Sequence, residues 1–123
     1  MIAVFDTNIV IDALNGVADA DVEYSRYARV LISRITWIEV MVGVREDEAQ
    51  VRNLLETRFE MIPLDFAVAE KAVDLRRSYR LRLPDAIIWA TAQVHATVLV
   101  TRNTRDFDVT WNGIRVPYQL PPG

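Results

Sequence analysis

Short apolar segments at five places along the chain predict β-strands. Residues 1–5 and residues 98–100 are uninterrupted apolar runs, which is typical of strands buried on both faces of a sheet. Residues 29–33 are apolar at the centre and polar at both ends, as expected for a strand. Residues 60–62, followed by a proline, and residues 114–116 predict two shorter strands.

Between these strands, the pattern indicates helices. Thr7 and Asn8 are expected to cap a helix over residues 9–14, which Asn15 and Gly16 end. The remaining segments that predict helix are residues 36–44, 46–56, 66–80 and 83–95, and residues 17–24 are expected to form a loop or a short helix.

Several polar residues stand where helices are expected to begin. Thr36 and Glu39 match a capping box, Asp65 is placed to cap the helix over residues 66–80, and Pro84 fits the first turn of the next helix. That next helix has Thr91 as its one polar side chain between residues 86 and 92, so we expect it to be buried nearly all round. The buried stripe expected for residues 66–80 is Ala69, Ala72, Val73 and Tyr79.

Strands that alternate with helices predict an α/β fold, specifically a three-layer α/β/α sandwich with a mainly parallel central sheet. The length of 123 residues fits one domain over residues 1–123, and no repeat or linker divides it. Residues 117–123 contain three prolines and are expected to form an irregular tail.

Composition narrows the possible chemistry. The chain has no cysteine and one histidine, His95, which excludes disulfides, thiolate metal sites and paired imidazoles. No apolar run reaches the ~18 residues of a membrane span and no signal segment is evident, so we expect a cytoplasmic protein without membrane contact. The net charge is −3, and Lys71 is the one lysine beside 13 arginines, which suit phosphate better than lysine does.

Acidic residues follow the predicted strands. Asp6 comes directly after the first strand, Glu39 after the second, and Asp106 in the loop after residues 98–100. Asp85 begins the buried helix, and each of the four has a simple alternative role as a helix or turn cap. Because strand ends and the following helix starts share one edge of a parallel sheet, we expect these acids to converge.

Four converging carboxylates repel one another unless they are protonated or neutralised by a cation. Oxygen ligands without cysteine or histidine favour a hard ion, Mg²⁺ or Mn²⁺, which binds a few carboxylates together with a substrate phosphate. The hypothesis is hydrolysis of a phosphodiester by a water that the metal activates.

Four motifs then make the sequence recognisable. They are Val4 to Asn8, Ser33 to Glu39, Leu83 to Ala92 and Val100 to Phe107. In this order they resemble the PIN-domain ribonucleases, and more closely the VapC-type toxins of type II toxin–antitoxin modules.

The resemblance implies an endoribonuclease that depends on Mg²⁺ or Mn²⁺ and cleaves an RNA substrate. It implies Asp6, Glu39, Asp85 and Asp106 as catalytic, metal-binding acids. It also implies polar support from Thr7, Asn8, Thr101 and Asn103. Some relatives carry an acid at the position of Asn103, so either Asn103 or Asp106 could lie nearer the metal. A homodimer and a VapB-type antitoxin that covers the active-site groove are also implied, with Trp37, Met41 and Val44 as groove or core residues.

Two other classes fit parts of the pattern. Receiver-like and phosphatase domains also cluster acids at the carboxyl edge of a parallel sheet, but they usually need a lysine near the phosphate, and Lys71 is predicted to lie within a helix. A non-catalytic PIN-like module that binds a protein or RNA is the third hypothesis. The candidate arginines for RNA contact are Arg34, Arg76, Arg80, Arg102 and Arg105.

Overall fold

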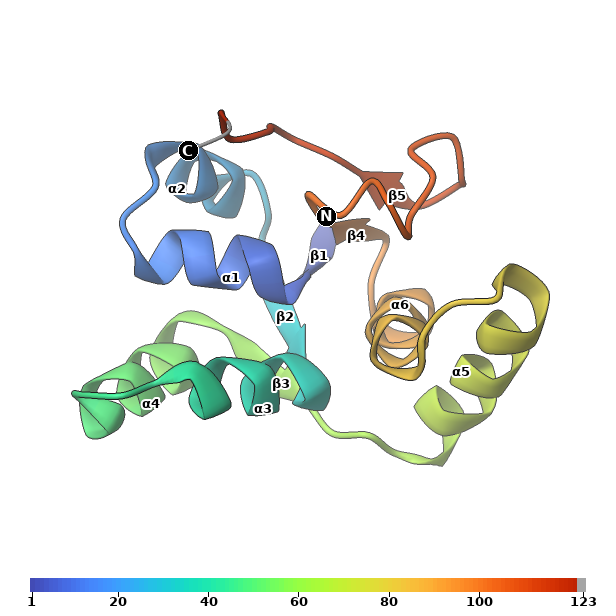
Figure 1. The fold of residues 1–123 in the computed structure, drawn as a ribbon, viewed down its shortest axis with the longest axis horizontal. Coiled ribbons are helices and arrows are strands. Elements are labelled where there is room, and N and C mark those ends of the chain that lie inside the picture. Colours follow the sequence, from blue (N-terminus) through green and yellow to red (C-terminus); the bar gives the residue numbers. More distant parts are fainter. Residues whose placement is uncertain (122–123) are drawn as a thin grey trace.

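The computed structural model describes residues 1–121, which contain a five-stranded sheet of order β3-β2-β1-β4-β5 (Figure 1). Each neighbouring pair of strands is parallel. The strands are β1 (Ile2–Phe5), β2 (Arg29–Ser33), β3 (Glu60–Ile62), β4 (Val98–Val100) and β5 (Ile114–Arg115). The predicted positions of these strands and the predicted parallel sheet are confirmed.

Helices cover both faces of the sheet, as Figure 1 shows. The group formed by α1, α2, α3 and α4 lies on one side, and α5 and α6 lie on the other. Their bounds are α1 (Thr7–Leu14), α2 (Ala18–Ser25), α3 (Arg34–Gly43), α4 (Glu48–Arg58), α5 (Phe66–Tyr79) and α6 (Leu83–His95). The predicted three-layer α/β/α sandwich is therefore confirmed.

The central strand β1 shows why its sequence is apolar throughout. Val4 packs into the core beneath α5 and α6, whereas Ala3 and Phe5 pack into the core beneath α1 and α2. Successive side chains of a strand point to opposite faces, so a strand covered on both faces needs apolar residues at every position.

Helix α6 is buried along most of its length, as predicted. All residues from Asp85 to Ala92 are buried, and the Thr91 hydroxyl donates to the Ile87 carbonyl oxygen at 2.8 Å, which satisfies the one polar side chain between residues 86 and 92. Trp89 is 2% exposed and stacks on Trp111, with ring centroids 5.3 Å apart. This packing holds α6 against the sheet and against the loop that carries Trp111.

The helix caps differ from the predicted ones at two places. Helix α1 begins at Thr7, so Asp6 is its N-cap, and the predicted capping by Thr7 and Asn8 is wrong. Helix α3 begins directly after β2 with Ser33 as its cap, accepting from the Ile35 amide at 3.1 Å. The predicted capping box at Thr36 is also wrong, because Thr36 lies inside the helix and is buried.

The predicted cap of α5 is confirmed, whereas its predicted buried stripe is partly wrong. Asp65 accepts from the Val68 amide at 3.0 Å. The buried residues of α5 are Val68, Ala72 and Leu75, and Val73 is 47% exposed. The stripe follows the single face that packs against α6, and spacings of four and three residues place Val68, Ala72 and Leu75 on that face.

Residues 116–121 form neither helix nor strand, and the last two residues of the predicted tail, 122–123, lie outside the described part. The Tyr118 hydroxyl donates to Asp12 at 2.8 Å, which ties this segment to α1. Within residues 1–121, no helix combines the length and apolar character needed to cross a membrane.

A buried ion pair joins α2 to β5. The Glu23 side chain is 3% exposed and accepts two hydrogen bonds from Arg115, at 2.7 and 3.1 Å. Burial acts to raise the pKa of Glu23, but hydrogen bonds from Arg115 and Tyr27 outweigh it, so the pKa is lowered. The pair therefore locks α2 against the last strand.

We predict that Arg115→Met destabilises the protein by about 3 kcal/mol, because Glu23 loses its main cationic partner while it stays buried. Urea unfolding at pH 7 measures this loss. Arg29→Gln is the matched control, because it breaks an ion pair with Glu60 whose two side chains are half exposed, and it should cost less than ~1 kcal/mol. Equal losses in the two variants would contradict the role of burial.

Candidate active site

The candidate site lies where the sheet reverses its direction of growth. From β1 the sheet extends through β2 on one side and through β4 on the other. Asp6 follows β1, Thr101 follows β4, and the Asp6 amide donates to the Val100 carbonyl oxygen at 2.9 Å. The crevice beyond the carboxyl ends of the strands at such a point is the usual ligand site of an open parallel sheet.

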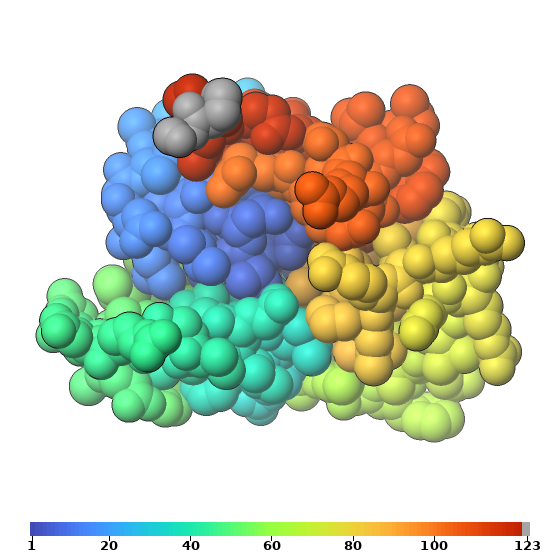
Figure 2. Space-filling model, viewed as in Figure 1, coloured from blue at the N-terminus to red at the C-terminus, as the bar shows by residue number. Residues whose placement is uncertain are grey.

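Four chain segments meet on this face of the molecule. Figure 2 shows the N-terminal segment in blue, α3 in cyan, the loop after β4 in orange and the start of α6 in yellow converging there. These segments carry the four acids predicted from the sequence, which are Asp6, Glu39, Asp85 and Asp106.

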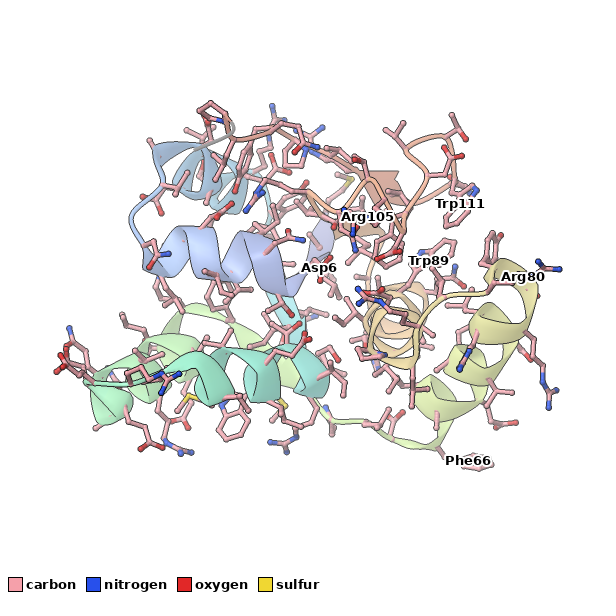
Figure 3. The ribbon with its side chains drawn as sticks, viewed as in Figure 1. Asp6, Phe66, Arg80, Trp89, Arg105 and Trp111 are labelled. Atoms are coloured by element: carbon pink, nitrogen blue, oxygen red, sulfur yellow. The ribbon has the colours of Figure 1, made fainter. Side chains whose placement is uncertain are left out.

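Asp6 is the most enclosed of the four carboxylates, at 4% exposed, and it lies in the centre of Figure 3. Its Oδ1 accepts from the Thr7 amide at 2.7 Å. Its Oδ2 accepts from the Thr101 hydroxyl at 2.7 Å and from the Asn8 side-chain amide at 3.3 Å. These donors are neutral, so they orient the carboxylate without balancing its charge.

The pKa of Asp6 is raised from its ordinary value of 3.8 to about 6. Burial is the largest cause, and the carboxylates of Asp85 and Glu39 raise it further, whereas the hydrogen bonds from Thr101 and Thr7 lower it. A cation placed beside Asp6 would remove this penalty on the charged form.

Thr7 links Asp6 to α3. Its hydroxyl donates to Glu39 Oε1 at 2.6 Å and lies 3.0 Å from the Thr36 hydroxyl. Glu39 is exposed and Thr36 is buried, so the contact holds Glu39 at the rim of the site. The position of Glu39 therefore depends on a side chain 32 residues earlier in the chain.

Asp85 and Asp106 share one arginine. Arg82 Nε lies 3.4 Å from Asp85 Oδ2, and Arg82 Nη2 lies 3.2 Å from Asp106 Oδ2. Burial raises the pKa of Asp85, and Arg82 acts against this. The hydrogen bond from Asn103 is the largest cause that lowers the pKa of Asp106.

Asn103 shapes the loop that carries Asp106. Its side-chain amide donates to Asp106 Oδ2 at 2.9 Å, and its Oδ1 accepts from the Asp106 backbone amide at 3.2 Å. The Asn103 backbone amide donates to the Thr101 hydroxyl oxygen at 2.9 Å. In the structure, Asn103 therefore supports Asp106, and Asp106 faces Arg82 and Asp85.

The structure thus joins all eight predicted residues in a chain of contacts around one sheet edge. The acids form two sets, with Asp6 and Glu39 connected through Thr7 in one, and Asp85 and Asp106 connected through Arg82 in the other. Within residues 1–121, no three acidic or imidazole side chains surround one point closely enough to hold a metal ion. The donors nevertheless suit Mg²⁺ or Mn²⁺, because they are carboxylate oxygens and Asp6 is buried without a cationic hydrogen-bond partner among the described residues.

Arg82 was missed as a site residue. Arg82 was not among the predicted site residues or the candidate arginines for RNA contact, and it occupies the N-cap position of α6. The signal for its contact was its spacing of three residues from Asp85, which lets the two side chains meet.

Arg102 is less available for RNA than the sequence suggested. It donates to Asp12 at 2.7 and 3.0 Å, and Asp12 is 5% exposed. This pair fastens the loop after β4 to α1. Arg105, on the same loop, is exposed and is labelled in Figure 3.

A family model described as PIN domain matches residues 3–110. One chain of a toxin–antitoxin complex from Klebsiella pneumoniae is 42% identical, with a TM-score of 0.86, and the match covers 96% of this chain and 99% of that chain. A chain of VapBC2 from Rickettsia felis, solved bound to a promoter DNA fragment, is 25% identical with a TM-score of 0.70 and coverages of 85% and 90%. A chain of DNA-bound VapBC from Salmonella typhimurium shares the fold at 21% identity, with a TM-score of 0.76 and coverages of 94% and 97%. No curated protein matches the chain.

We predict that Asp6→Asn stabilises the metal-free protein at neutral pH by about 1 to 2 kcal/mol. The native carboxyl keeps its proton up to about pH 6, whereas the unfolded one loses it near pH 4. Burial of Asp6 therefore costs the folded state no stability from ionisation below pH 4, and it costs the full amount above pH 6. Thermal unfolding in EDTA from pH 4 to pH 8 should show a difference between wild type and variant that grows with pH.

Asp12→Asn is the control for this experiment, because Asp12 is also a buried aspartate of the same region but is paired with Arg102. It should destabilise the protein at neutral pH by about 2 kcal/mol. Destabilisation by Asp6→Asn at pH 7 would contradict the assignment of Asp6 as a buried charge without a counter-ion.

Proposed function

The chain belongs to the PIN domain family, and we propose that it is a metal-dependent endoribonuclease acting as the toxin of a type II toxin–antitoxin pair. The observation that carries this proposal is the convergence of Asp6, Glu39, Asp85 and Asp106 from four chain segments at the reversal point of the sheet. The similarity to a chain of the Klebsiella pneumoniae toxin–antitoxin complex, along almost the whole length of both, supports it. Its site of action would be the cytoplasm, where RNA is abundant.

In this proposal the four acids hold Mg²⁺ or Mn²⁺. A bound ion would supply a water of lowered pKa and offset the charge that develops on the scissile phosphate. Thr101, Thr7 and Asn8 fix the Asp6 carboxylate through hydrogen bonds, and Asn103 fixes Asp106. Because these side chains are already held in place, little reorganisation is needed when the substrate arrives.

RNA would meet positive charge only locally, since the net charge of the chain is −3. Arg105 is exposed on the loop that carries Asp106, and Arg34 is partly buried at the start of α3. Both lie on segments that form the site, so they are the arginines best placed to contact a phosphate next to the scissile bond.

The receiver-like or phosphatase alternative has less support. Lys71 lies in the middle of α5, and within the described residues no hydrogen bond or ion pair connects it to the four acids. The non-catalytic alternative predicts RNA or protein binding without cleavage. The following experiment separates this alternative from the endoribonuclease proposal.

We predict that the purified chain cleaves total bacterial RNA with Mg²⁺ or Mn²⁺, and that EDTA abolishes cleavage. Asp85→Asn should slow it by about a hundredfold or more, because a carboxylate that holds the metal is lost. Since water attacks the phosphorus and the bond to the 3′-oxygen breaks, the products should carry 5′-phosphate and 3′-hydroxyl ends. Sequencing of product ends from a broad RNA pool measures both site and end chemistry.

Asp108→Asn is the matched control for cleavage, because Asp108 is an exposed acid of the same loop whose carboxylate accepts from Thr110. This variant should keep wild-type activity. Cleavage that survives EDTA and leaves cyclic phosphate ends would falsify the metal mechanism, and binding of RNA without cleavage would favour the non-catalytic alternative.

The toxin part of the proposal needs a VapB-type antitoxin and, by family resemblance, a homodimer. A groove of about 350 Å³ beside Glu39 is lined by Ile11, Val44 and Val51, and it is a candidate for the antitoxin. Trp37 and Met41 are partly buried against the core, so packing accounts for them.

For the dimer, Phe66 on α5 is 78% exposed and points away from the body in Figure 3, and Val73 and Leu83 line a second exposed hollow. These apolar side chains suit a surface that a second copy covers.

We predict that induced expression of the chain without an antitoxin arrests bacterial growth and that Asp85→Asn relieves the arrest at equal protein levels. Optical density and immunoblotting measure the two quantities together. Asp108→Asn should arrest growth as the wild type does. Equal arrest by the Asp85→Asn variant would show that toxicity does not depend on the proposed site.

A further inference from the structure

Arg82 contacts two of the acids assigned to the metal, and it does so with one guanidinium. Its Nε lies 3.4 Å from Asp85 and its Nη2 lies 3.2 Å from Asp106, two acids that come from α6 and from the loop after β4. A single positive group therefore bridges carboxylates that would otherwise repel each other.

The contacts of Arg82 differ from those of the arginines that neutralise other buried acids. Arg102 holds Asp12 with two hydrogen bonds of 2.7 and 3.0 Å, and Arg115 holds Glu23 with two of 2.7 and 3.1 Å. In both cases one arginine grips one carboxylate with two nitrogens, which is the strong, directional geometry of this pair. Arg82 gives each acid one longer contact.

Arg82 is also more exposed to solvent than the two arginines that pair with Asp12 and Glu23. The Arg82 side chain is 74% exposed, whereas the side chains of Arg102 and Arg115 are 24% and 37% exposed. A guanidinium in solvent is screened and is held weakly, so it can leave at small cost. The first turn of α6 does not depend on it either, since Arg82 makes no side-chain cap hydrogen bond.

We propose that Arg82 is an internal counter-cation that holds Asp85 and Asp106 together and competes with the divalent metal for them. Metal binding at these two acids requires the guanidinium to give up its contacts with them. The cation that neutralises Asp85 and Asp106 before metal binds is thus the Arg82 guanidinium. The cost of displacing this guanidinium lowers the affinity of the two acids for the metal. This inference rests on the proposed function, because it takes Asp85 and Asp106 as metal ligands.

The test is the affinity of the full-length chain for Mn²⁺ alone, measured by electron paramagnetic resonance titration of free Mn²⁺ and by isothermal titration calorimetry. Arg82→Gln should bind Mn²⁺ about three- to tenfold more tightly than the wild type, because two weak ion pairs no longer compete. A purely structural role predicts the opposite, since loss of a positioning contact weakens a metal site. Circular dichroism of the variant checks that the fold is retained.

Arg105→Gln is the matched control. It removes the same charge from the loop that carries Asp106, but Arg105 makes no ion pair with the acids within the described residues. Its affinity should stay within about twofold of the wild type, because a through-space effect at an exposed position is screened. An equal gain in both variants would overturn the proposal in favour of general electrostatics.

Asp85→Asn separates failure of this inference from failure of the proposed function. If Asp85→Asn abolishes Mn²⁺ binding while Arg82→Gln binds as the wild type does or more weakly, the metal assignment stands and competition by Arg82 is overturned. If Asp85→Asn leaves Mn²⁺ binding unchanged, or if neither the wild type nor Arg82→Gln binds Mn²⁺, the metal assignment fails and this inference fails with it.

Discussion

The hydrogen bond from Thr101 to Asp6 joins the two strand ends between which the sheet reverses. It fixes a buried carboxylate at the carboxyl edge, and the rest of the site is built outward from it. Thr7, the next residue in the chain, donates both its amide to Asp6 and its hydroxyl to Glu39 on α3. The cost of this arrangement is visible in the pKa of Asp6, which burial and neighbouring acids raise to about 6.

The acids of this chain fall into two groups that differ in how their charge is compensated. Asp12 accepts two hydrogen bonds from Arg102 and Glu23 accepts two from Arg115, and both pairs connect distant segments of the fold. Within residues 1–121, the acids of the candidate site have only neutral donors, as Asp6 does, or a share of the exposed guanidinium of Arg82. Structural acids are thus fully compensated inside the protein, whereas the site acids retain unbalanced charge that a cation can meet.

Much of the fold could be predicted because local patterns carry it. Strand β2 and the buried helix α6 lie where their apolar runs indicate, and Asp65 caps α5 as its position suggests. The wrong capping prediction at Thr36 has a spatial cause. Thr36 fits a capping box by spacing, but β2 runs directly into α3, so Thr36 is turned inward to meet Thr7 instead. Which residue caps a helix depends on where the preceding strand ends. The spacing of a capping-box motif does not give that position.

Residue types and their spacing were enough to predict the order of strands and helices along the chain, the all-oxygen character of the candidate site and the family resemblance. Which side chains meet could be learned only from the folded chain. In the folded chain Asn103 supports Asp106, Arg102 pairs with Asp12, and Arg82 contacts both Asp85 and Asp106. These contacts join residues that are distant in the chain, or depend on which way a long side chain turns, and a one-dimensional pattern specifies neither.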